Sequence, residues 1–329
     1  MHTVIESTDS AFHQYWSRLY ANDPLQNPLY GQQGSDRAES GNNAPQFTDR
    51  SFLVISGNEP VFGCSLTLHT DADGRKRMGY FGLEASTHVN RKSLQQTSNS
   101  FRPEAIDLLQ QHIRGLIDEV KPDSLDYLDP VSCGMMSPVT QVLLEIGAKP
   151  TIYKAQLINL ALSERSLLRL VSKTYRSLIN WGQQNLEFSI IVGSTDGAEE
   201  ISLAELFNSG NQPLASIGSD FWSACQDILK EGNGFLVQAR HNETLVANAM
   251  FVYNDMTCHY VAGEVLSNAP SRPILQSVIW EAIMHSKKLG CAQFELACAL
   301  TKEATQEFDI LPERFGGESQ TRLKISLVQ

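Results

Sequence analysis

Two glutamates in apolar segments are the residues best suited to acid–base chemistry in this chain. Glu264 follows the strand-like run Thr257–Gly263, and Glu295 lies inside the apolar run Cys291–Leu296. An amine must lose a proton to attack a carbonyl carbon, so N-acyl transfer needs a base close to that amine. Apolar surroundings favour the protonated form of a carboxyl group, which suits this task. Both glutamates are therefore candidate catalytic bases.

The same carboxylates also have a structural interpretation. Arg272 and Arg314 occur near these segments, and either could pair with a buried carboxylate. His259 alternates with apolar neighbours, so we interpret it as a packed side chain. The sequence has no Gly-x-Ser-x-Gly element, P-loop, dinucleotide-binding fingerprint or HExxH motif. A covalent mechanism through serine or cysteine therefore has no motif to support it.

A run of cations in an otherwise acidic protein is the second candidate feature. A helix is predicted from its cap, Ser163, to about Gln184. Four cations recur in it at intervals of four, four and three residues, which places them on one helix face: Arg165, Arg169, Lys173 and Arg176. Such a stripe could bind a phosphate or carboxylate, and Arg176 is the strongest candidate. The alternative interpretation is a solvated helix face.

The third feature is the segment Arg314-Phe315-Gly316-Gly317-Glu318. Adjacent glycines permit positive φ and a close approach of the backbone to another group. Arg314 could hold an anion or pair with Glu295 or Asp309. A tight turn or a bulge would also account for the two glycines, and both interpretations stay open.

The fourth feature is the turn that precedes the predicted helix Pro273–Leu289. The N–H groups at the start of a helix suit a phosphate, and Arg272 lies one residue before this helix. The stretch from Ser267 to Gln276 contains prolines but no glycine. It therefore lacks the glycine-rich loop with which many enzymes cradle a phosphate-bearing donor, and a proline-containing turn takes its place.

Composition restricts the class of protein. The 329 residues are 42% hydrophobic and 19% charged, and the formal net charge is −11. Such a charge repels polyanions at long range, which disfavours broad nucleic-acid binding. No run approaches the roughly 18 apolar residues of a membrane-spanning helix, and no secretory leader is evident, so we expect a cytoplasmic protein. The six cysteines show no CxxC spacing, and we expect neither a disulfide framework nor a metal site.

The order of elements predicts an α+β protein. Hairpin signals occur at Gly57-Asn58-Glu59-Pro60 and at His241-Asn242-Glu243, and hairpins require antiparallel pairing. Each half of the chain presents a hairpin-bearing sheet, then a helix, then a further strand. We therefore predict two related lobes, residues 1–150 and residues 151–329, each a mixed and largely antiparallel sheet flanked by helices.

The end of the chain carries a resemblance to a known family. A helix ending at Gly290, an apolar strand, the basic-aromatic-diglycine segment and a closing strand, Leu323–Val328, follow one another. This order resembles the C-terminal end of the Fem-type (FemAB-like) acyl and aminoacyl transferases, which have a GNAT-like fold. The segment Tyr175–Gly182 also looks like the Fem-type helix that lies beside the substrate cleft.

The resemblance implies two GNAT-like lobes and an N-acyltransferase that acts by direct attack. It implies an acid at Glu295, a substrate-side arginine at Arg176, and a donor- or substrate-binding role for the four residues Arg314, Phe315, Gly316 and Gly317. The donor would be acyl-CoA, another thioester or aminoacyl-tRNA, used as a co-substrate with no bound cofactor. The acceptor would be an amine of a cell-envelope sugar, a peptidoglycan precursor or an amino-acid-like molecule. The net charge disfavours tRNA, because binding it requires several phosphate contacts.

Two departures from the family pattern leave a second function open. Glu295 is followed by Leu296-Ala297-Cys298 where a diglycine is common, and Leu311-Pro312-Glu313 replaces a Phe-Lys lead. A catalytically silent GNAT-like module that binds a ligand or partner would tolerate both changes. The transferase hypothesis predicts a furrow in which Arg176 and Arg314 meet beside Glu295. The sequence does not indicate an oligomeric state.

Overall fold

The hairpins predicted from the sequence are present in the computed structural model of the chain. Strands β3 (Phe52–Ser56) and β4 (Glu59–Ser65) pair antiparallel around Gly57, whose φ is +63°. Strands β11 (Gly234–His241) and β12 (Thr244–Tyr253) pair likewise. Their turn residues, Asn242 and Glu243, both have positive φ. This pattern is typical of a tight two-residue hairpin turn.

The chain divides into two units. Unit 1 comprises Met1–Gln26, Tyr30–Tyr153 and Thr321–Gln329, and unit 2 comprises Asn27–Leu29 and Lys154–Gln320. The predicted single boundary near residue 150 thus leaves out the return of the last strand to unit 1. The structure describes residues 2–23, 26–31, 47–71, 73–81, 83–90, 103–130, 136–193, 202–208, 219–296 and 312–328.

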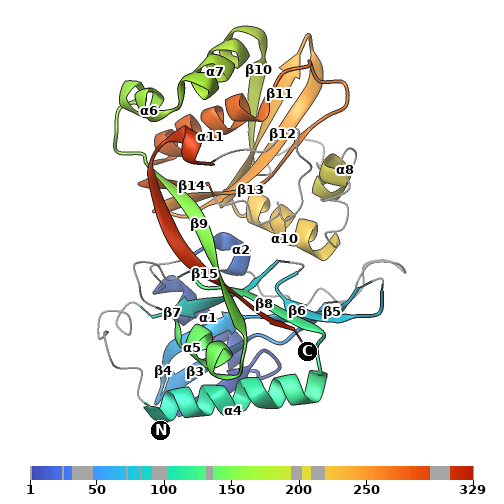
Figure 1. Ribbon diagram of the computed structural model, residues 1–329, viewed down its shortest axis with the longest axis vertical. Helices are drawn as coiled ribbons and strands as arrows, with labels where there is room; N and C mark the ends of the chain where they lie inside the picture. Colours follow the sequence, from blue (N-terminus) through green and yellow to red (C-terminus); the bar gives the residue numbers. More distant parts are fainter. Residues whose placement is uncertain are drawn as a thin grey trace. The chain divides into compact units, whose positions relative to one another are not determined.

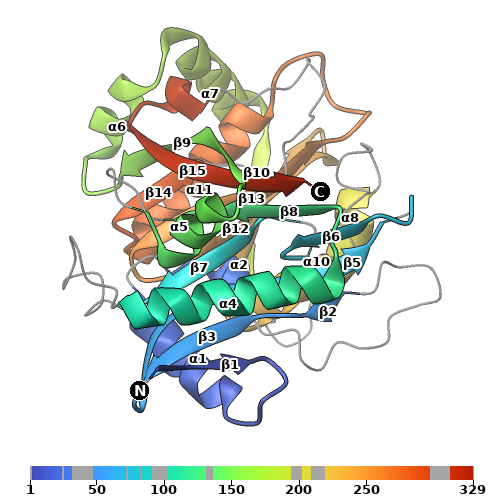
Figure 2. The same ribbon diagram turned by 60° about the horizontal axis from the view of Figure 1, so that its bottom comes forward.

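Unit 1 is an α+β sheet covered by helices (Figures 1 and 2). Its helices are α1 (Phe12–Ala21), α2 (Pro28–Gly31, which begins in unit 2), α4 (Pro103–Val120) and α5 (Pro138–Glu145). Its remaining strands are β1 (His2–Glu6), β2 (Thr48–Asp49), β5 (Thr67–Thr70), β6 (Lys76–Gly79), β7 (Ala85–Val89), β8 (Ser124–Leu128) and β15 (Glu318–Val328, which begins in unit 2). Pairing is antiparallel except where β8 meets β6 and β7.

Unit 2 has the same character. Its helices are α6 (Glu164–Leu170), α7 (Lys173–Asn185), α8 (Leu203–Asn208), α10 (Ser219–Lys230), α11 (Leu275–Leu289) and the 3₁₀ turn η1 (Pro312–Phe315). Its remaining strands are β9 (Lys149–Asn159, which begins in unit 1), β10 (Glu187–Val192), β13 (Thr257–Val265) and β14 (Gln293–Leu296). The strand order is β9-β14-β13-β12-β11-β10, and among the strands that the structure describes here only β13 and β14 are parallel. The predicted fold class, α+β with mixed and largely antiparallel sheets, is confirmed.

The two faces of the unit 2 sheet carry different residues. One face packs on α7 and α11: Val237, Ala249 and Phe294 share an apolar core with Ile179 and Val278 of these helices. Successive side chains of a strand point to opposite faces. The residues between these apolar positions therefore project to the other face, on the side where Figure 1 shows α10.

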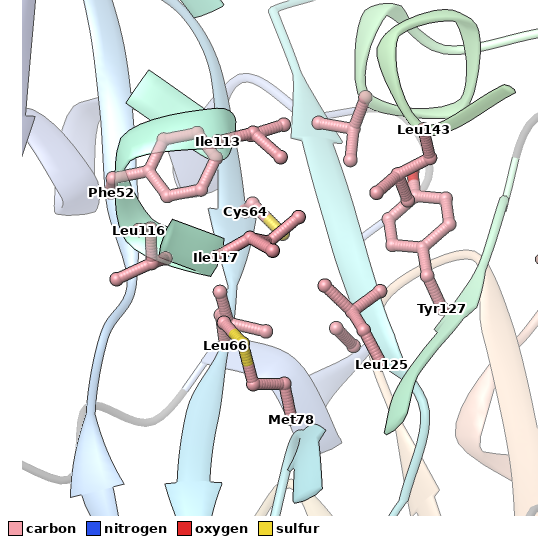
Figure 3. A pocket seen from close by; sticks show the side chains of 12 residues that line it. Phe52, Cys64, Leu66, Met78, Ile113, Leu116, Ile117, Leu125, Tyr127 and Leu143 are labelled. Atoms are coloured by element: carbon pink, nitrogen blue, oxygen red, sulfur yellow. The ribbon is translucent and has the colours of Figure 1, made fainter. Parts of the chain in front are cut away.

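A small apolar cavity lies in unit 1 between the sheet and the helices α4 and α5. Its volume is about 20 Å³, and Figure 3 shows its lining, which includes Cys64 and Tyr127. The Tyr127 hydroxyl is bonded to Ser137 Oγ at 2.7 Å. Burial raises the pKa of the Cys64 thiol, which keeps it uncharged. A site this poor in polar partners does not hold an ordered water.

Filling this cavity should stabilise unit 1. Val139 lines the cavity, and Val139→Ile adds one methylene, for which we expect about 0.8 kcal/mol of added stability. Val142 is fully buried on the same helix but does not line the cavity. Val142→Ile is therefore expected to overpack the core and to cost about 1–3 kcal/mol. Urea denaturation of the two variants should shift in opposite directions, and equal shifts would contradict this account.

Unit 1 also contains a buried Ser–His–Asp chain. Ser65 Oγ lies 3.1 Å from His88 Nε2, and His88 Nδ1 lies 2.8 Å from Asp23 Oδ2. The order is that of a hydrolase triad. However, Ser65 is 0% exposed and its hydroxyl donates to Tyr30 O at 3.1 Å. These three hydrogen-bonded side chains therefore have a structural role, because they connect the end of α1 to β4 and β7. This agrees with the absence of a nucleophile motif in the sequence.

Candidate functional site

The parallel strands β13 and β14 lie side by side in the middle of unit 2. Their pairing runs from Thr257 with Gln293 to His259 with Glu295. β14 is described as far as Leu296, and β13 continues to Val265 with a register shift against β12 after Tyr260. His259 and Glu295 are therefore direct neighbours on adjacent parallel strands.

His259 and Glu295 form a buried pair across β13 and β14. Their strand neighbours Cys258, Tyr260 and Phe294 belong to the core under α11, so both side chains project to the opposite face. His259 Nδ1 lies 3.6 Å from Glu295 Oε2, and the residues are 9% and 5% exposed. An imidazole beside a buried carboxylate is an arrangement that can accept and pass on a proton.

The role of His259 is the point that sequence reasoning missed. Alternation with apolar residues predicts a packed histidine, and His259 is indeed buried, but it also contacts the candidate base. Glu295 has this contact in place of the predicted pairing with Arg272 or Arg314. The Arg272 guanidinium lies over the Trp181 ring at 5.4 Å, and Arg314 lies over the Tyr175 ring at 5.9 Å.

Glu264 lies on the same face as Glu295, farther along β13. It pairs in register with Asn248, and it is 3% exposed. Four strand residues separate the Val252–His259 row from the Asn248–Glu264 row, which corresponds to about 13 Å. The two candidate bases therefore share a face but do not act on the same atom in this conformation.

The predicted helix from Ser163 to about Gln184 is broken in two. Val171 has an extended backbone, with ψ of 137°, and Ser172 caps α7 by accepting a hydrogen bond from Tyr175 N. The four cations consequently do not form a single face: Arg165 and Arg169 belong to α6, and Lys173 and Arg176 belong to α7. Arg169 and Lys173 are exposed.

Arg176 closes the break between α6 and α7. Its Nη1 donates to the carbonyl oxygens of Arg169 at 3.0 Å and Val171 at 2.8 Å. The last carbonyls of a helix lack intrahelical partners, and basic side chains often satisfy them. Arg176, which the sequence indicates as the strongest candidate for binding an anion, thus donates its hydrogen bonds within the protein.

The Arg314–Gly317 segment packs against this same junction. Arg314 O accepts from Ser172 N at 2.8 Å, and the buried Phe315 ring meets Tyr175 edge-on at 5.1 Å. Gly316 and Gly317 have φ of +82° and +86°. The tight-turn interpretation therefore accounts for the two glycines without any ligand.

The expected furrow that joins Arg176, Arg314 and Glu295 is not formed by the described residues. Arg176 and Arg314 do come together, at the junction of α6 and α7. That junction packs on the core face of the sheet, whereas Glu295 projects from the opposite face. The physical reason is the alternation of side chains along β14. Phe294 and Leu296 point into the core, so Glu295, which lies between them in the sequence, points to the opposite face. The family departures at 297–298 and Leu311 lie outside the described residues.

Arg176→Ala tests this structural role. We expect a loss of about 1–2 kcal/mol in stability, because the carbonyl oxygens of Arg169, which is exposed, and Val171, which is buried, lose a charged donor. The affinity for the acyl donor should not change. Arg169→Ala removes an exposed cation and should change stability by less than about 0.5 kcal/mol. Thermal unfolding and donor titration measure both quantities. Weaker donor binding with unaltered stability would restore Arg176 as an anion-binding residue.

The start of α11 is the remaining place for an anionic group. Its cap position, Ile274, provides no side-chain hydrogen bond, so the first N–H groups of the helix are not capped by a side chain. Arg272 lies just before it, as predicted. At the other end of α11, burial raises the pKa of the thiols of Cys258 and Cys291. Neither cysteine therefore supplies a thiolate nucleophile at neutral pH.

Comparison with known proteins settles the fold. No protein-family description and no curated protein matches the sequence. Among solved structures, a tandem GNAT protein from the clavulanic acid biosynthesis pathway aligns over 100% of this chain and 98% of its own, with a TM-score of 0.60 and 12% identity. FemX aligns over 99% and 97%, with a TM-score of 0.60 and 11% identity. The chain has a tandem GNAT, FemAB-like fold.

A third structure extends this agreement. The C-terminal domain of a putative lysylphosphatidylglycerol synthetase from Agrobacterium fabrum aligns over 95% of the chain and 90% of its own, with a TM-score of 0.57 and 12% identity. At such identities the similarity is one of fold. The GNAT-like fold predicted from the C-terminal segments is confirmed, and so is its duplication. No helix among the described residues is long and apolar enough to cross a membrane.

Proposed function

We propose that unit 2 transfers an acyl or aminoacyl group from a thioester or aminoacyl-tRNA donor to the amine of an acceptor. The acceptor would be a cell-envelope sugar, a peptidoglycan precursor or an amino-acid-like molecule. The observation that carries the proposal is the buried His259–Glu295 pair on the parallel strands β13 and β14. It puts a proton acceptor and an imidazole side by side on the sheet of a GNAT-like fold. The names of the similar structures, a tandem GNAT protein and FemX, support the same reaction class.

In the proposed mechanism the acceptor amine attacks the donor carbonyl carbon directly. Glu295 takes the proton that the amine loses, and His259 orients the carboxylate and stabilises its charge. The donor thiolate leaves when the tetrahedral intermediate collapses, and it takes up a proton. Glu264 remains the second candidate base.

Charge and helix geometry favour a thioester donor. The start of α11 and Arg272 would hold the phosphates of acyl-CoA. The net charge of −11 opposes the many phosphate contacts that a tRNA requires. Arg169, Lys173 and Arg314 stay candidates for donor or substrate contacts, because part of each side chain is exposed.

The test is a turnover screen. Purified protein would be combined with acyl-CoA donors and primary-amine acceptors, with thiol release and product mass as readouts. We expect amine-dependent thiol release with at least one donor. The proposal fails if no donor is consumed and isothermal titration detects no donor binding.

A silent binding module is the second candidate. The observation that favours it is the intramolecular use of Arg176 and the packing of Arg314 on Tyr175. Such a module would bind a donor or acceptor in titration but would release no thiol in the turnover screen. The two functions are therefore separated by one pair of measurements.

A further inference from the structure

A row of three polar side chains crosses the centre of the unit 2 sheet. The strand registers pair Gln238 of β11 with Asn248 of β12, and Asn248 with Glu264 of β13. Directly paired residues project from the same face of a sheet. Since Ala247 and Ala249 belong to the core under α11, this row lies on the opposite face, which also carries Glu295. The three side chains belong to residues that are 8%, 0% and 3% exposed.

Asn248 is the informative member of the row. Neither its Oδ1 nor its Nδ2 makes a hydrogen bond within the described part of the chain. Buried carboxamides nearly always have partners, and a leucine of the same shape would avoid the desolvation penalty. On α10, which packs against β11, the buried Trp222 also has an indole Nε1 without a hydrogen-bond partner. Polar groups buried at such a cost indicate that a ligand supplies their partners.

We propose that Gln238, Asn248 and Glu264 recognise the acceptor, and that this acceptor is a primary amine carrying carboxamide groups, as in a short peptide. The inference rests on the proposed transferase function. Asn248 offers one donor group and one acceptor atom, and a carboxamide offers the complement of both. The carboxylate of Glu264 accepts from peptide N–H groups, and Gln238 can pair with either side of a peptide unit.

The spacing of the rows sets the length of this acceptor. The row of His259 and the row of Glu264 are about 13 Å apart along the strands. With its amine beside Glu295, an extended peptide of three residues spans about 10–11 Å, at roughly 3.3–3.6 Å for each residue. A hydrogen bond of about 3 Å from its terminal carboxamide to Asn248 covers the rest of the distance. Triglycinamide is therefore a suitable probe, and octylamine is an apolar amine of comparable length.

The first experiment measures thermal stability alone. Asn248→Leu should raise the melting temperature by about 2–4 °C, because it removes an unsatisfied buried carboxamide. Asn254 is the matched control, since its Oδ1 accepts from Met256 N and Thr257 N at 2.8 Å. Asn254→Leu should lower the melting temperature. A lower melting temperature for Asn248→Leu would show that Asn248 serves the fold and would overturn the proposal.

The second experiment measures recognition. Triglycinamide should raise the melting temperature of the wild type, octylamine should not, and Asn248→Leu and Glu264→Gln should abolish the response. With acetyl-CoA as donor, Asn248→Leu should raise the KM for triglycinamide at least tenfold and leave the KM for acetyl-CoA unchanged. If triglycinamide bound in a manner that depends on Asn248 but was not acylated, the proposed transferase function would be wrong. The proposed recognition by the polar row would still stand. If both amines were acylated, with equal KM values in the wild type and the variant, the proposed recognition by the polar row would be wrong. The proposed transferase function would still stand.

Discussion

Replacement of Gly317 by alanine is expected to cost more than about 3 kcal/mol, enough to keep unit 2 from folding at ordinary temperature. A Cβ atom at this position would lie 2.2 Å from the carbonyl oxygen of Leu157, a backbone atom of β9 that cannot move aside. The φ of +86° adds the strain of a left-handed conformation in a residue with a side chain. The loss should appear as a lower yield of folded protein and as an earlier urea transition.

Gly57 provides the matched control. Its φ is +63°, but a Cβ atom there would meet nothing within 4 Å. Gly57→Ala therefore isolates the backbone strain, for which we expect about 1 kcal/mol. If Gly317→Ala were no more damaging than Gly57→Ala, the close approach of the 314–317 turn to β9 would not be a requirement of the fold.

The second large effect concerns Glu295. In the transfer assay, Glu295→Gln should lower kcat/KM by about 10²–10⁴, the usual contribution of a general base. The substitution keeps the shape of the side chain, so thermal stability should change little. The dependence of kcat/KM on pH separates a catalytic role from a structural one. The variant should lose the rise in rate that deprotonation of the base produces, whereas a purely structural role would leave that rise in place.

Glu281 is the control for this test. It is a partly buried carboxylate on α11, and burial raises its pKa, but it does not lie on the sheet face that carries His259. Glu281→Gln should keep kcat/KM within about twofold. If both variants lost activity equally, the effect would come from the fold and the assignment of Glu295 as base would fail.

Much of the site was beyond sequence reasoning because its positions depend on strand parity and register. The spacing of Arg165, Arg169, Lys173 and Arg176 predicts a cationic stripe only if the helix is continuous. An extended Val171 and a capping Ser172 end that continuity. The polar row was also missed, although Gln238 and Asn248 interrupt two apolar strand runs, and such an interruption was the signal available.

By itself, the amino-acid sequence determined the α+β class, the hairpins, the helix that ends at Gly290 and the GNAT-like order of the final elements. These features depend on the periodicity of apolar residues, on turn residues and on the φ values that glycine permits. All three are properties of short stretches of sequence. Only the tertiary structure decided that Arg176 and Arg314 meet on the core side of the unit 2 sheet, while Glu295, His259 and Asn248 share the other side. The reason is that a one-residue change of parity or register moves a side chain to the opposite face, and strand pairing between distant segments sets that register.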